Sequence, residues 1–545
     1  MLIILRFDSM NNVGKIVLLT SLLQIIGIEY ILPSGIIGGD LIEQWNYVAI
    51  ASLISLIAFI FYFYFSGKED CFHFLGNVII WGIIISISIE AIWGLLQLYG
   101  YLPSFHSVFK VTGTFFNPAP YSGYLALGGP LCLNELLVLR KEKNKSFLKL
   151  YSYCFLIFVL LLIVVVLPCG MSRSAWISTI FSSLFVLEMH YSFYSSLKNV
   201  WLKGPNKVFC LILVALILLL CIGGYLFFLK KDSALGRLFM WKIECRAIAQ
   251  KPLLGYGANS FAHTYKITQE DYFSSELFSE EEEFVAGVVK YAFNEYFQMA
   301  IEYGLPVLFL YIGFCVYGVY IGIKNKRYGI CGGIISFMIF SFSSYPLHLP
   351  VLFSSFLLLL LAAIAKHDKA FLWLYVFLFS SLVFLNYKPY ESEAYNHWRR
   401  SEIYWVNDGR QALIEYEKLY PLLGNNASFL FKYGFCLYRN KRYEEAIECL
   451  KEAELLSCDP MILNVIGRCY QLQHKYEEAE YWYIRSTHFL PNRIYPYYLL
   501  AKLYAEPDYY NSTELNRMKD IVLFKEPKVY SKAIEEMREE IQRLK

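Results

Sequence analysis

The chain has 545 residues, of which 57% are hydrophobic and 18% aromatic, and its mean hydropathy is +0.41. This composition is far more apolar than that of an ordinary soluble globular protein, and it indicates an integral membrane protein. The net charge of +3 is nearly balanced, so the charge total gives no indication of nucleic-acid binding.

Apolar windows long enough to cross a bilayer, about 20 residues each, recur up to residue 388. The first long run lacks a small-residue cleavage site, so it is expected to be a retained helix. The sequence predicts an all-α fold, with a polytopic membrane helix bundle of eleven spans. The windows are 15–37, 45–66, 74–98, 119–139, 150–169, 174–190 (the weakest), 208–229, 294–323, 329–345, 349–365 and 370–387.

Lysine and arginine concentrate in one set of the connections between these windows. With the N-terminus placed inside the cell, the basic residues of the short outer connections are Lys110 and Arg173 only. This asymmetry satisfies the positive-inside rule in one orientation and violates it in the other. It places a large loop, 230–293, and everything after about residue 388 on the outer side of the membrane.

Several outward-facing stretches carry polar residues beside the spans. In "TGTFFNPAPYSGYL", Asn117 and the neighbouring prolines and glycines indicate a turn before a span. Arg173, in "CGMSRSAW", suits phosphate because its planar fork binds two oxygens, with snorkelling to headgroups as the alternative. The stretch "SALGRLFMWKIECRAIAQKPLLGYGANSF" predicts an amphipathic interfacial helix that carries Arg237 and ends before Pro252. A solvated surface charge is the alternative for Arg237.

A polar stripe opens the apolar window 294–323. Asn294, Gln298 and Glu302 recur at helical spacing and share one face, with Glu295 beside it. Amide groups left unpaired in lipid are costly, so this face is expected to line a polar cavity where Asn294 and Gln298 hydrogen-bond the substrate.

The tail over 389–545 is charged and repetitive. Ala412, Ala446 and Ala479 are separated by 34 and 33 residues, and "YEEA" is followed four positions on by a bulky residue. This pattern resembles tetratricopeptide repeats and predicts a TPR-like α-solenoid of paired helices, with an irregular helical tail as the alternative. Disulfides and free buried thiols both remain open for the tail's cysteines, which are Cys436, Cys449, Cys458 and Cys469.

Four motifs in order over roughly 110–320 resemble the bacterial O-antigen ligases and polymerases, with their protein O-oligosaccharyltransferase relatives. They are "GTFFNPAPYSGYL", "SRSAWISTIFSSLFV", "GRLFMWKIECRAIAQKPLLGYGANSF" and "FNEYFQMAIEYGLPV". The resemblance implies a domain over 1–388 in the bacterial inner membrane, with a cytoplasmic N-terminus and periplasmic repeats. It implies glycan transfer from an undecaprenyl diphosphate carrier to a hydroxyl of lipid A-core or of a protein Ser or Thr, without a metal or other cofactor.

The resemblance also implies roles for single residues. Two family arginines match Arg173 and Arg237, whose guanidinium groups can stabilise the leaving diphosphate. Where ligases carry a histidine, this chain has Phe293, which cannot accept a proton. Glu295 is therefore the candidate base, with a helix N-terminal charge as the alternative reading. Glu302, His263 and His348 are the other outward-facing groups that could accept a proton, with ordinary structural or surface roles as their alternatives. The candidate substrate-lining residues are Asn117, Asn294, Gln298, Glu302 and His348.

Three functions remain open at this stage. The first is a ligase-type transferase, the second a polysaccharide repeat-unit polymerase, and the third a non-catalytic envelope assembly scaffold, which Phe293 keeps open. The repeats favour a protein-handling version, because such arrays present a concave peptide-binding surface. The expected partners are the lipid-linked glycan, an acceptor lipid or protein, a protein bound by the repeats, and membrane lipids, without nucleic acid.

Overall fold

A computed structural model describes residues 12–32, 39–65, 70–141, 146–193, 231–275, 278–365, 368–407 and 409–544. The regular structure in these ranges is helical, as predicted, and they contain no strand. The described chain divides into two compact units. The first contains the described residues up to 193, with 293–295 and 309–392, and the second contains those of 231–292, 296–308 and 393–544.

The membrane bundle is confirmed, although the count of eleven spans is not. Among the described residues, six helices are long and apolar enough to cross a membrane, and three shorter apolar helices accompany them. The predicted span 208–229 lies outside the described residues, and 174–190 forms a helix that is not among the six. The helices of this region are α1 (Asn12–Ile26), α2 (Ile28–Ile31), α3 (Gly39–Phe65), α4 (Asp70–Leu98), α5 (Pro118–Lys141), α6 (Phe147–Cys169), α7 (Arg173–Tyr191), α14 (Leu305–Lys324), α15 (Tyr328–Ser341), η2 (Pro346–His348), α16 (Pro350–Ile364) and α17 (Lys369–Asn386).

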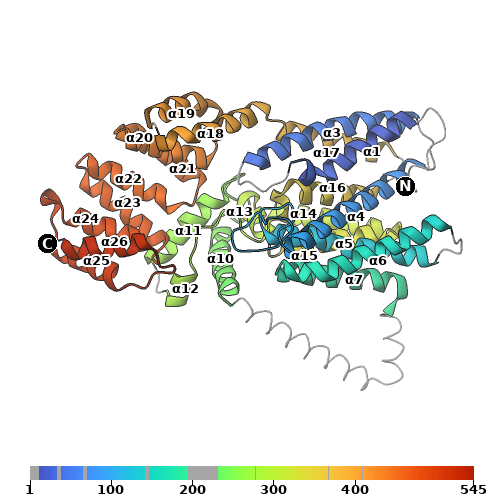
Figure 1. Cartoon of the computed structure of the whole chain (residues 1–545), viewed down its shortest axis with the longest axis horizontal. Coiled ribbons are helices and arrows are strands. Elements are labelled where there is room, and N and C mark those ends of the chain that lie inside the picture. Colours follow the sequence, from blue (N-terminus) through green and yellow to red (C-terminus); the bar gives the residue numbers. More distant parts are fainter. Residues whose placement is uncertain are drawn as a thin grey trace, which may run out of the picture. The chain divides into compact units, whose positions relative to one another are not determined.

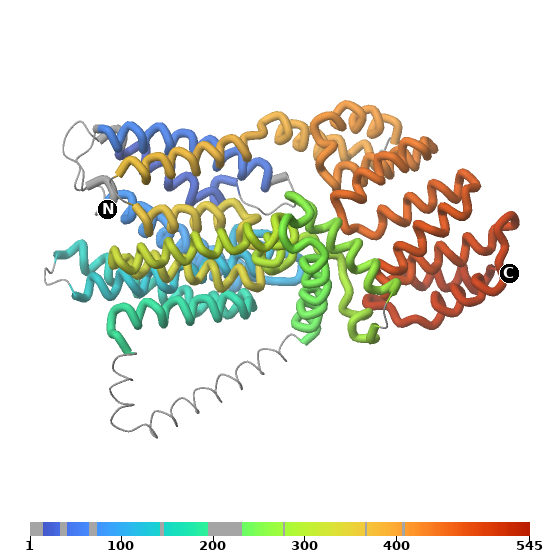
Figure 2. Tube along the Cα trace, turned by 180° about the vertical axis from the view of Figure 1, so that it is seen from behind, coloured from blue at the N-terminus to red at the C-terminus, as the bar shows by residue number. Residues whose placement is uncertain are grey.

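Small residues and aromatic stacking hold this bundle together. Helix α5 packs against α4, α6, α7 and α15. Close approach to α15 requires a glycine, because a Cβ on Gly123 would lie 2.2 Å from the Phe340 ring. Helices α3 and α17, from distant parts of the sequence, lie side by side (Figure 2). Between them the Ser55 and Tyr375 hydroxyls are 2.7 Å apart.

The predicted window 294–323 proves to be two helices. Helix α13 (Glu295–Tyr303) ends at Gly304, which has a φ of +84°, and the apolar α14 begins at the next residue. Gly304 is required here because a Cβ would lie 2.1 Å from the carbonyl oxygen of Leu253. The polar stripe therefore belongs to a separate short helix, and the apolar span begins only after it.

The repeats of the second unit pack as the sequence predicts. A Cβ on Gly434 would lie 2.6 Å from Leu450, and one on Gly467 would lie 2.4 Å from Tyr483. These bulky residues are the ones four positions after each "YEEA" alanine. The helices stack in antiparallel pairs (Figure 1). They are α18 (Pro389–Asn407), α19 (Gly409–Leu423), α20 (Ala427–Arg439), α21 (Tyr443–Leu456), α22 (Pro460–Leu472), α23 (Tyr476–Phe489), α24 (Ile494–Tyr504), η3 (Pro507–Tyr509), α25 (Ser512–Phe524) and α26 (Lys532–Arg543).

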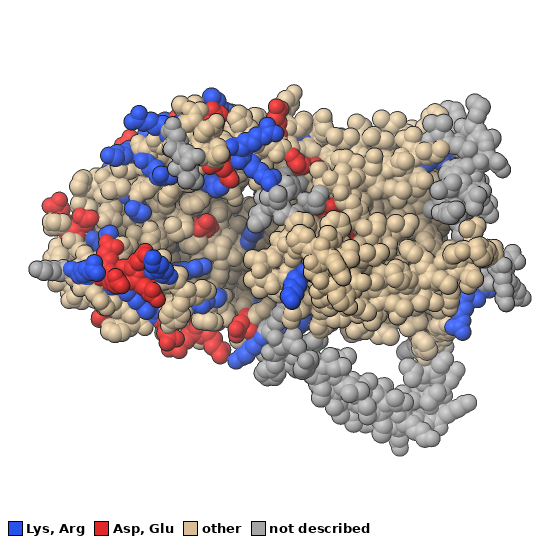
Figure 3. All heavy atoms as spheres, in the orientation of Figure 1, with Lys and Arg blue, Asp and Glu red and all other residues tan. Residues whose placement is uncertain are grey.

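The surface of the repeats differs from that of the bundle. Lysine, arginine, aspartate and glutamate side chains gather over the repeats, and few appear on the bundle face that the same view shows (Figure 3). The four cysteines of the tail are buried free thiols. The sequence left open whether these cysteines form disulfides or remain free thiols, and in the structure they are free thiols.

The described parts of the loop 230–293, up to residue 292, belong to the second unit with the repeats. This loop forms α10 (Lys231–Gln250), α11 (Phe261–Ser275) and α12 (Glu280–Val285). A buried ion-pair network joins α11 to the repeats. Lys266 Nζ lies 2.6 Å from Glu454 Oε1, and Arg485 bridges Glu454 and Glu270 at 2.9 Å from each. Cys458 Sγ donates to the carbonyl of Val289 at 2.8 Å. The loop and the repeats thus share one core.

Candidate functional site

Glu295 and His348 come together in the first unit. Glu295 is the first residue of α13, and His348 ends the short turn η2, which lies between Pro346 and Pro350. The Glu295 Oε1 accepts a hydrogen bond from the backbone N–H of Leu347 at 2.6 Å and lies 3.4 Å from His348 Nδ1. The exposed fraction of the side chain is 2% for Glu295 and 29% for His348. The carboxylate is thus enclosed, whereas the imidazole remains accessible.

Phe293 packs against the segment that carries His348. Its backbone is left-handed, with a φ of 49°, and its ring meets Tyr345 edge-on at a centroid distance of 5.2 Å. Phe293 stands where the family motif has a histidine. It contacts Tyr345, three residues before His348, so the same segment brings another imidazole close to this position. The sequence alone gave His348 as a lining residue and one of the remaining outward imidazoles, and gave no sign of its contact with Glu295.

Arg173 and Asn117 both lie at helix N-termini of the first unit. Arg173 is the first residue of α7 and is partly buried. Asn117 precedes α5, and its Oδ1 accepts from the backbone N–H of Ala119 at 3.0 Å. The side-chain oxygen of Asn117 therefore caps a helix, which is the ordinary structural use of asparagine at this position.

Two residues that the sequence reasoning missed hold the loop before α5. Glu90 is fully buried, and its carboxylate accepts from the Thr114 backbone N–H at 3.1 Å and from the Thr114 hydroxyl. Gln97 Oε1 accepts from the N–H groups of Thr112 and Gly113 at 2.9 and 2.8 Å. Sequence reasoning could have found Glu90, because a carboxyl group inside an apolar helix is rare and usually functional.

Gln298 and Glu302 are buried and hydrogen-bonded within the second unit. Gln298 Oε1 accepts from the backbone N–H of Ala292 at 3.2 Å, and its Nε2 donates to Glu302 Oε1 at 3.1 Å. Asn294 belongs to the segment 293–295 of the first unit and is also buried. Arg237 lies on α10 and is partly exposed. The structure therefore brings Gln298 and Glu302 together through their own hydrogen bond.

The third and fourth motifs of the sequence meet at the end of α13. The backbone N–H groups of Tyr256 and Gly257 donate to the carbonyls of Ile301 and Glu302 at 2.8 and 2.9 Å. A Cβ on Gly255, whose φ is +63°, would lie 2.6 Å from both of these carbonyl oxygens. The glycines of "LLGYG" thus let this turn satisfy the carbonyl groups that the helix end exposes.

Helix α10 buries a carboxyl group that the sequence assigned to an amphipathic surface. Glu244 is fully buried, and neither of its oxygens has a hydrogen-bond partner in the described structure. The buried hydroxyl of Tyr265 also lacks one. Burial raises the pKa of Glu244 well above its usual range. Within the described residues, no group of three or more His, Cys, Asp or Glu side chains could hold a metal ion.

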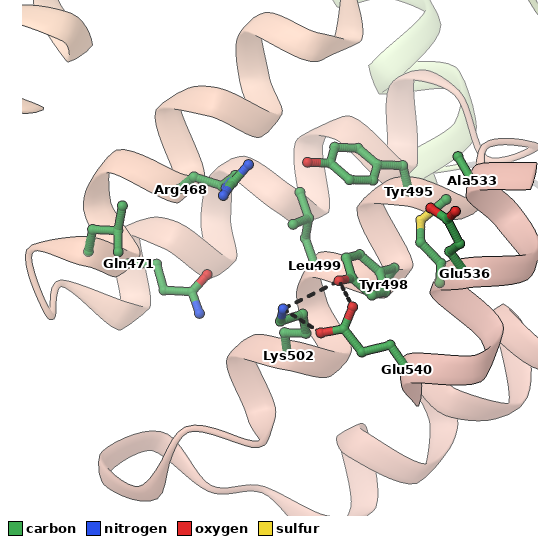
Figure 4. A pocket seen from close by; sticks show the side chains of 11 residues that line it. Arg468, Gln471, Tyr495, Tyr498, Leu499, Lys502, Ala533, Glu536 and Glu540 are labelled. Atoms are coloured by element: carbon green, nitrogen blue, oxygen red, sulfur yellow. Dashed lines mark hydrogen bonds and ion pairs between the residues drawn. The ribbon is translucent and has the colours of Figure 1, made fainter. Parts of the chain in front are cut away.

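The repeats contain a pocket of about 480 Å³ between α22, α24 and α26. Arg468 and Tyr495 point toward one another across it (Figure 4). The Arg468 guanidinium also lies 5.2 Å from the centre of the Tyr438 ring, and the described structure gives it no carboxylate partner. On the opposite side, Lys502 donates to Glu540 of α26 at 2.8 Å. One cation of the pocket thus pairs with a carboxylate, whereas the other contacts tyrosine side chains, including a hydrogen bond with Tyr495.

Two family models match parts of the chain. Residues 123–312 match the model described as O-Antigen ligase. Residues 406–486 match the model described as Anaphase-promoting complex, cyclosome, subunit 3, a TPR-like repeat. No curated protein sequence matches the chain. The two matches fall on the membrane region with its loop and on the helical repeats.

Proposed function

We propose that this protein, which carries an O-antigen ligase domain in a multi-pass membrane bundle, moves a glycan from an undecaprenyl diphosphate carrier to an acceptor hydroxyl. The acceptor is a sugar of lipid A-core or a protein Ser or Thr. The acceptor oxygen bonds to the anomeric carbon, the bond from that carbon to the diphosphate oxygen breaks, and the acceptor proton passes to a base. The reaction takes place at the periplasmic face of the bacterial inner membrane, with the repeats on the same side.

The contact between Glu295 and His348 is the observation that carries this proposal. A transferase needs a proton acceptor, and Phe293 removes the family's usual one. The His348 imidazole is accessible, and one of its ring nitrogens faces the Glu295 carboxylate at 3.4 Å. In this arrangement the carboxylate orients the ring and stabilises its protonated form, while the other ring nitrogen accepts the proton. Glu295 is too enclosed to reach an acceptor directly, so it acts through His348.

Arg173 and Arg237 are the proposed groups for the diphosphate. The leaving group develops negative charge as the glycosidic bond breaks, and a guanidinium group can pair with two phosphate oxygens. The N-terminal position of Arg173 adds the positive end of the α7 dipole to its charge. Asn117, Asn294, Gln298 and Glu302 are proposed to shape the glycan-binding side, with Gln298 and Glu302 acting mainly to keep α13 in place.

The repeat pocket supports a protein partner with an acidic group. Arg468 presents a guanidinium group that lacks a carboxylate partner, and Leu472, Leu499 and Met537 give the same pocket apolar walls. An acidic residue next to a bulky apolar one fits both features. The partner's carboxylate would bind Arg468 as Glu540 binds Lys502.

The test compares His348→Asn and Glu295→Gln, with His397→Asn on the exposed surface of α18 as the control. Each variant is expressed in a deletion strain, and envelope glycans are analysed by gel and mass spectrometry beside protein level. Loss of a general base lowers the rate by about 10²–10⁴-fold, so His348→Asn is expected to abolish transfer and His397→Asn to retain it.

The purified protein in lipid nanodiscs separates the roles of the two residues. The carboxylate orients the imidazole and the imidazole accepts the proton, so Glu295→Gln is expected to keep partial activity, whereas His348→Asn is expected to keep none. If Glu295→Gln is inactive at every pH while His348→Asn is active, Glu295 itself is the base. If neither variant changes transfer, the proposal is wrong.

A further inference from the structure

The turn between α10 and α11 exposes two neighbouring leucines. The exposed fraction is 68% for Leu253 and 88% for Leu254. Single exposed apolar residues are common on protein surfaces and need no explanation. Two adjacent leucines at the tip of a fixed turn are different, because the fold gives them nothing to pack against.

The turn is held in this position by α13 and its end. Tyr256 and Gly257 bond to the last carbonyl groups of α13, and the backbone N–H of Leu305 donates to the carbonyl of Pro252 at 2.8 Å. Gly255 and Gly304 each lie too close to backbone atoms to accept a side chain. The leucines therefore cannot withdraw into the protein without breaking this arrangement.

The hydrogen bond from Leu305 to Pro252 ties the turn to the first residue of α14. Leu305 is the first residue of α14, which is long and apolar enough to cross a membrane. Farther along this helix, Phe309 and Leu310 are 66% and 73% exposed, as expected for lipid-facing side chains. A helix rises about 1.5 Å per residue, so Phe309 and Leu310 follow Leu305 by only about 6–8 Å along the axis of α14. The turn that carries the two leucines is thus bonded to the first residue of this apolar helix.

The neighbours of the leucines suit a lipid interface. Lys251 stands 4.5 Å from the centre of the Tyr256 ring. Lysine and tyrosine are typical of the headgroup level, where an apolar body meets a polar end. The ammonium group and the phenol ring thus flank the two leucines in the sequence, as polar ends suited to the headgroups beside an apolar tip.

We propose that Leu253 and Leu254 insert into the acyl chains of the membrane leaflet in which α14 begins, with the Lys251 ammonium at the phosphates of that leaflet. The occupant of this surface is phospholipid. The insertion fixes the end of α10 and the end of α13 at one depth, because the turn is bonded to both. The proposal does not depend on which leaflet this is, nor on the proposed glycan transfer.

The test places a photo-crosslinking benzoylphenylalanine at position 254 of the full chain in nanodiscs of phosphatidylcholine and phosphatidylglycerol. The control position is 524, because Phe524 is 78% exposed in the same unit, on α25. After irradiation, mass spectrometry is expected to find a phospholipid adduct on the peptide that contains position 254, at least tenfold above that for position 524.

Either of two other results overturns the proposal. One is an equal or absent lipid adduct at both positions, and the other is crosslinking of position 254 to protein alone. The side chain at position 254 is almost fully exposed, so the label there leaves the fold intact. A thermal unfolding midpoint equal to that of the unlabelled protein verifies this for each sample.

Discussion

The ion-pair network between α11 and the repeats leads to a prediction about Glu454→Gln. Lys266 is 1% exposed, and its charge is balanced by the Glu454 carboxylate at 2.6 Å. Without that carboxylate, Lys266 retains the carbonyl oxygens of Glu454 and Ser457, at 2.9 and 3.5 Å. Burial already lowers the pKa of Lys266, and Glu454 opposes this shift. Breaking a buried ion pair on one side costs about 3–5 kcal/mol.

The effect of Lys266→Met is expected to be smaller. Although burial raises the pKa of Glu454, Lys266 and Arg485 together hold it below the usual value. When Lys266 is removed, Arg485 still pairs with Glu454 at 2.9 Å. The loss is then closer to that of one charged hydrogen bond, about 1.5–3 kcal/mol. The two halves of one pair thus differ in how much their removal costs.

Cys458 provides the assay, because its thiol is buried at the junction and bonds to Val289. The full chain in detergent is treated with an alkylating reagent, and peptide mass spectrometry measures the labelling rate of each cysteine. A loss of 3 kcal/mol corresponds to about a hundredfold faster labelling, at about 1.4 kcal/mol per factor of ten. Cys469, fully buried within α22, reports on the repeats themselves and is expected to change little.

Glu514→Gln is the matched control, because Glu514 pairs with Arg517 in an exposed position where ion pairs contribute about 0–1 kcal/mol. Labelling of Cys458 in Glu454→Gln at the wild-type rate would refute the reasoning. A parallel rise at Cys458 and Cys469 would also refute it, because the network would then stabilise the repeats as a whole and not the junction.

Three further predictions concern single positions. Gly304→Ala is expected to lower the thermal unfolding midpoint, because left-handed backbone costs a non-glycine residue about 1–2 kcal/mol before the clash with Leu253; Gly313→Ala, which has open space around it, is the control. The wild-type protein is expected to lose stability as the pH rises from 5 to 8, and Glu244→Gln is expected to lack this loss. A carboxyl with a raised pKa favours folding below its unfolded pKa of about 4.3, and this contribution is lost as the pH rises through the folded value; denaturant unfolding at both pH values measures it. Arg468→Gln is expected to weaken binding of an acidic peptide in fluorescence anisotropy at least tenfold, whereas unchanged affinity would remove the pocket from consideration.

The sequence predicted best what repeats along the chain. The period of the tail placed small residues against bulky ones, and Gly434 and Gly467 lie against Leu450 and Tyr483 as that pattern requires. Helical periodicity also predicted α10 and placed its end before Pro252. These features depend on local spacing, which the sequence displays directly.

Contacts between distant segments were not predictable in the same way. The break at Gly304 arises because the carbonyl of Leu253 occupies the space beside it, and nothing local to Gly304 indicates that. Likewise Glu295 and His348 are separated by 53 residues. Their contact depends on where α13 begins and where η2 ends, which local spacing does not reveal. Glu244 shows the same limit, since helical spacing gave no reason to bury it without a partner.

The loop and the repeats form one unit, and this bears on how the proposed transfer could be controlled. Arg237 and the Gln298–Glu302 pair belong to the unit that contains the repeats, whereas Arg173, Glu295 and His348 belong to the membrane bundle. A protein bound in the repeat pocket would therefore contact the same folded body that carries part of the proposed site. An appended domain linked only through a flexible tether would not have this property. The buried Lys266–Glu454 pair joins the loop to the repeats, so loosening it by Glu454→Gln is expected to uncouple partner binding from glycan transfer while each persists separately.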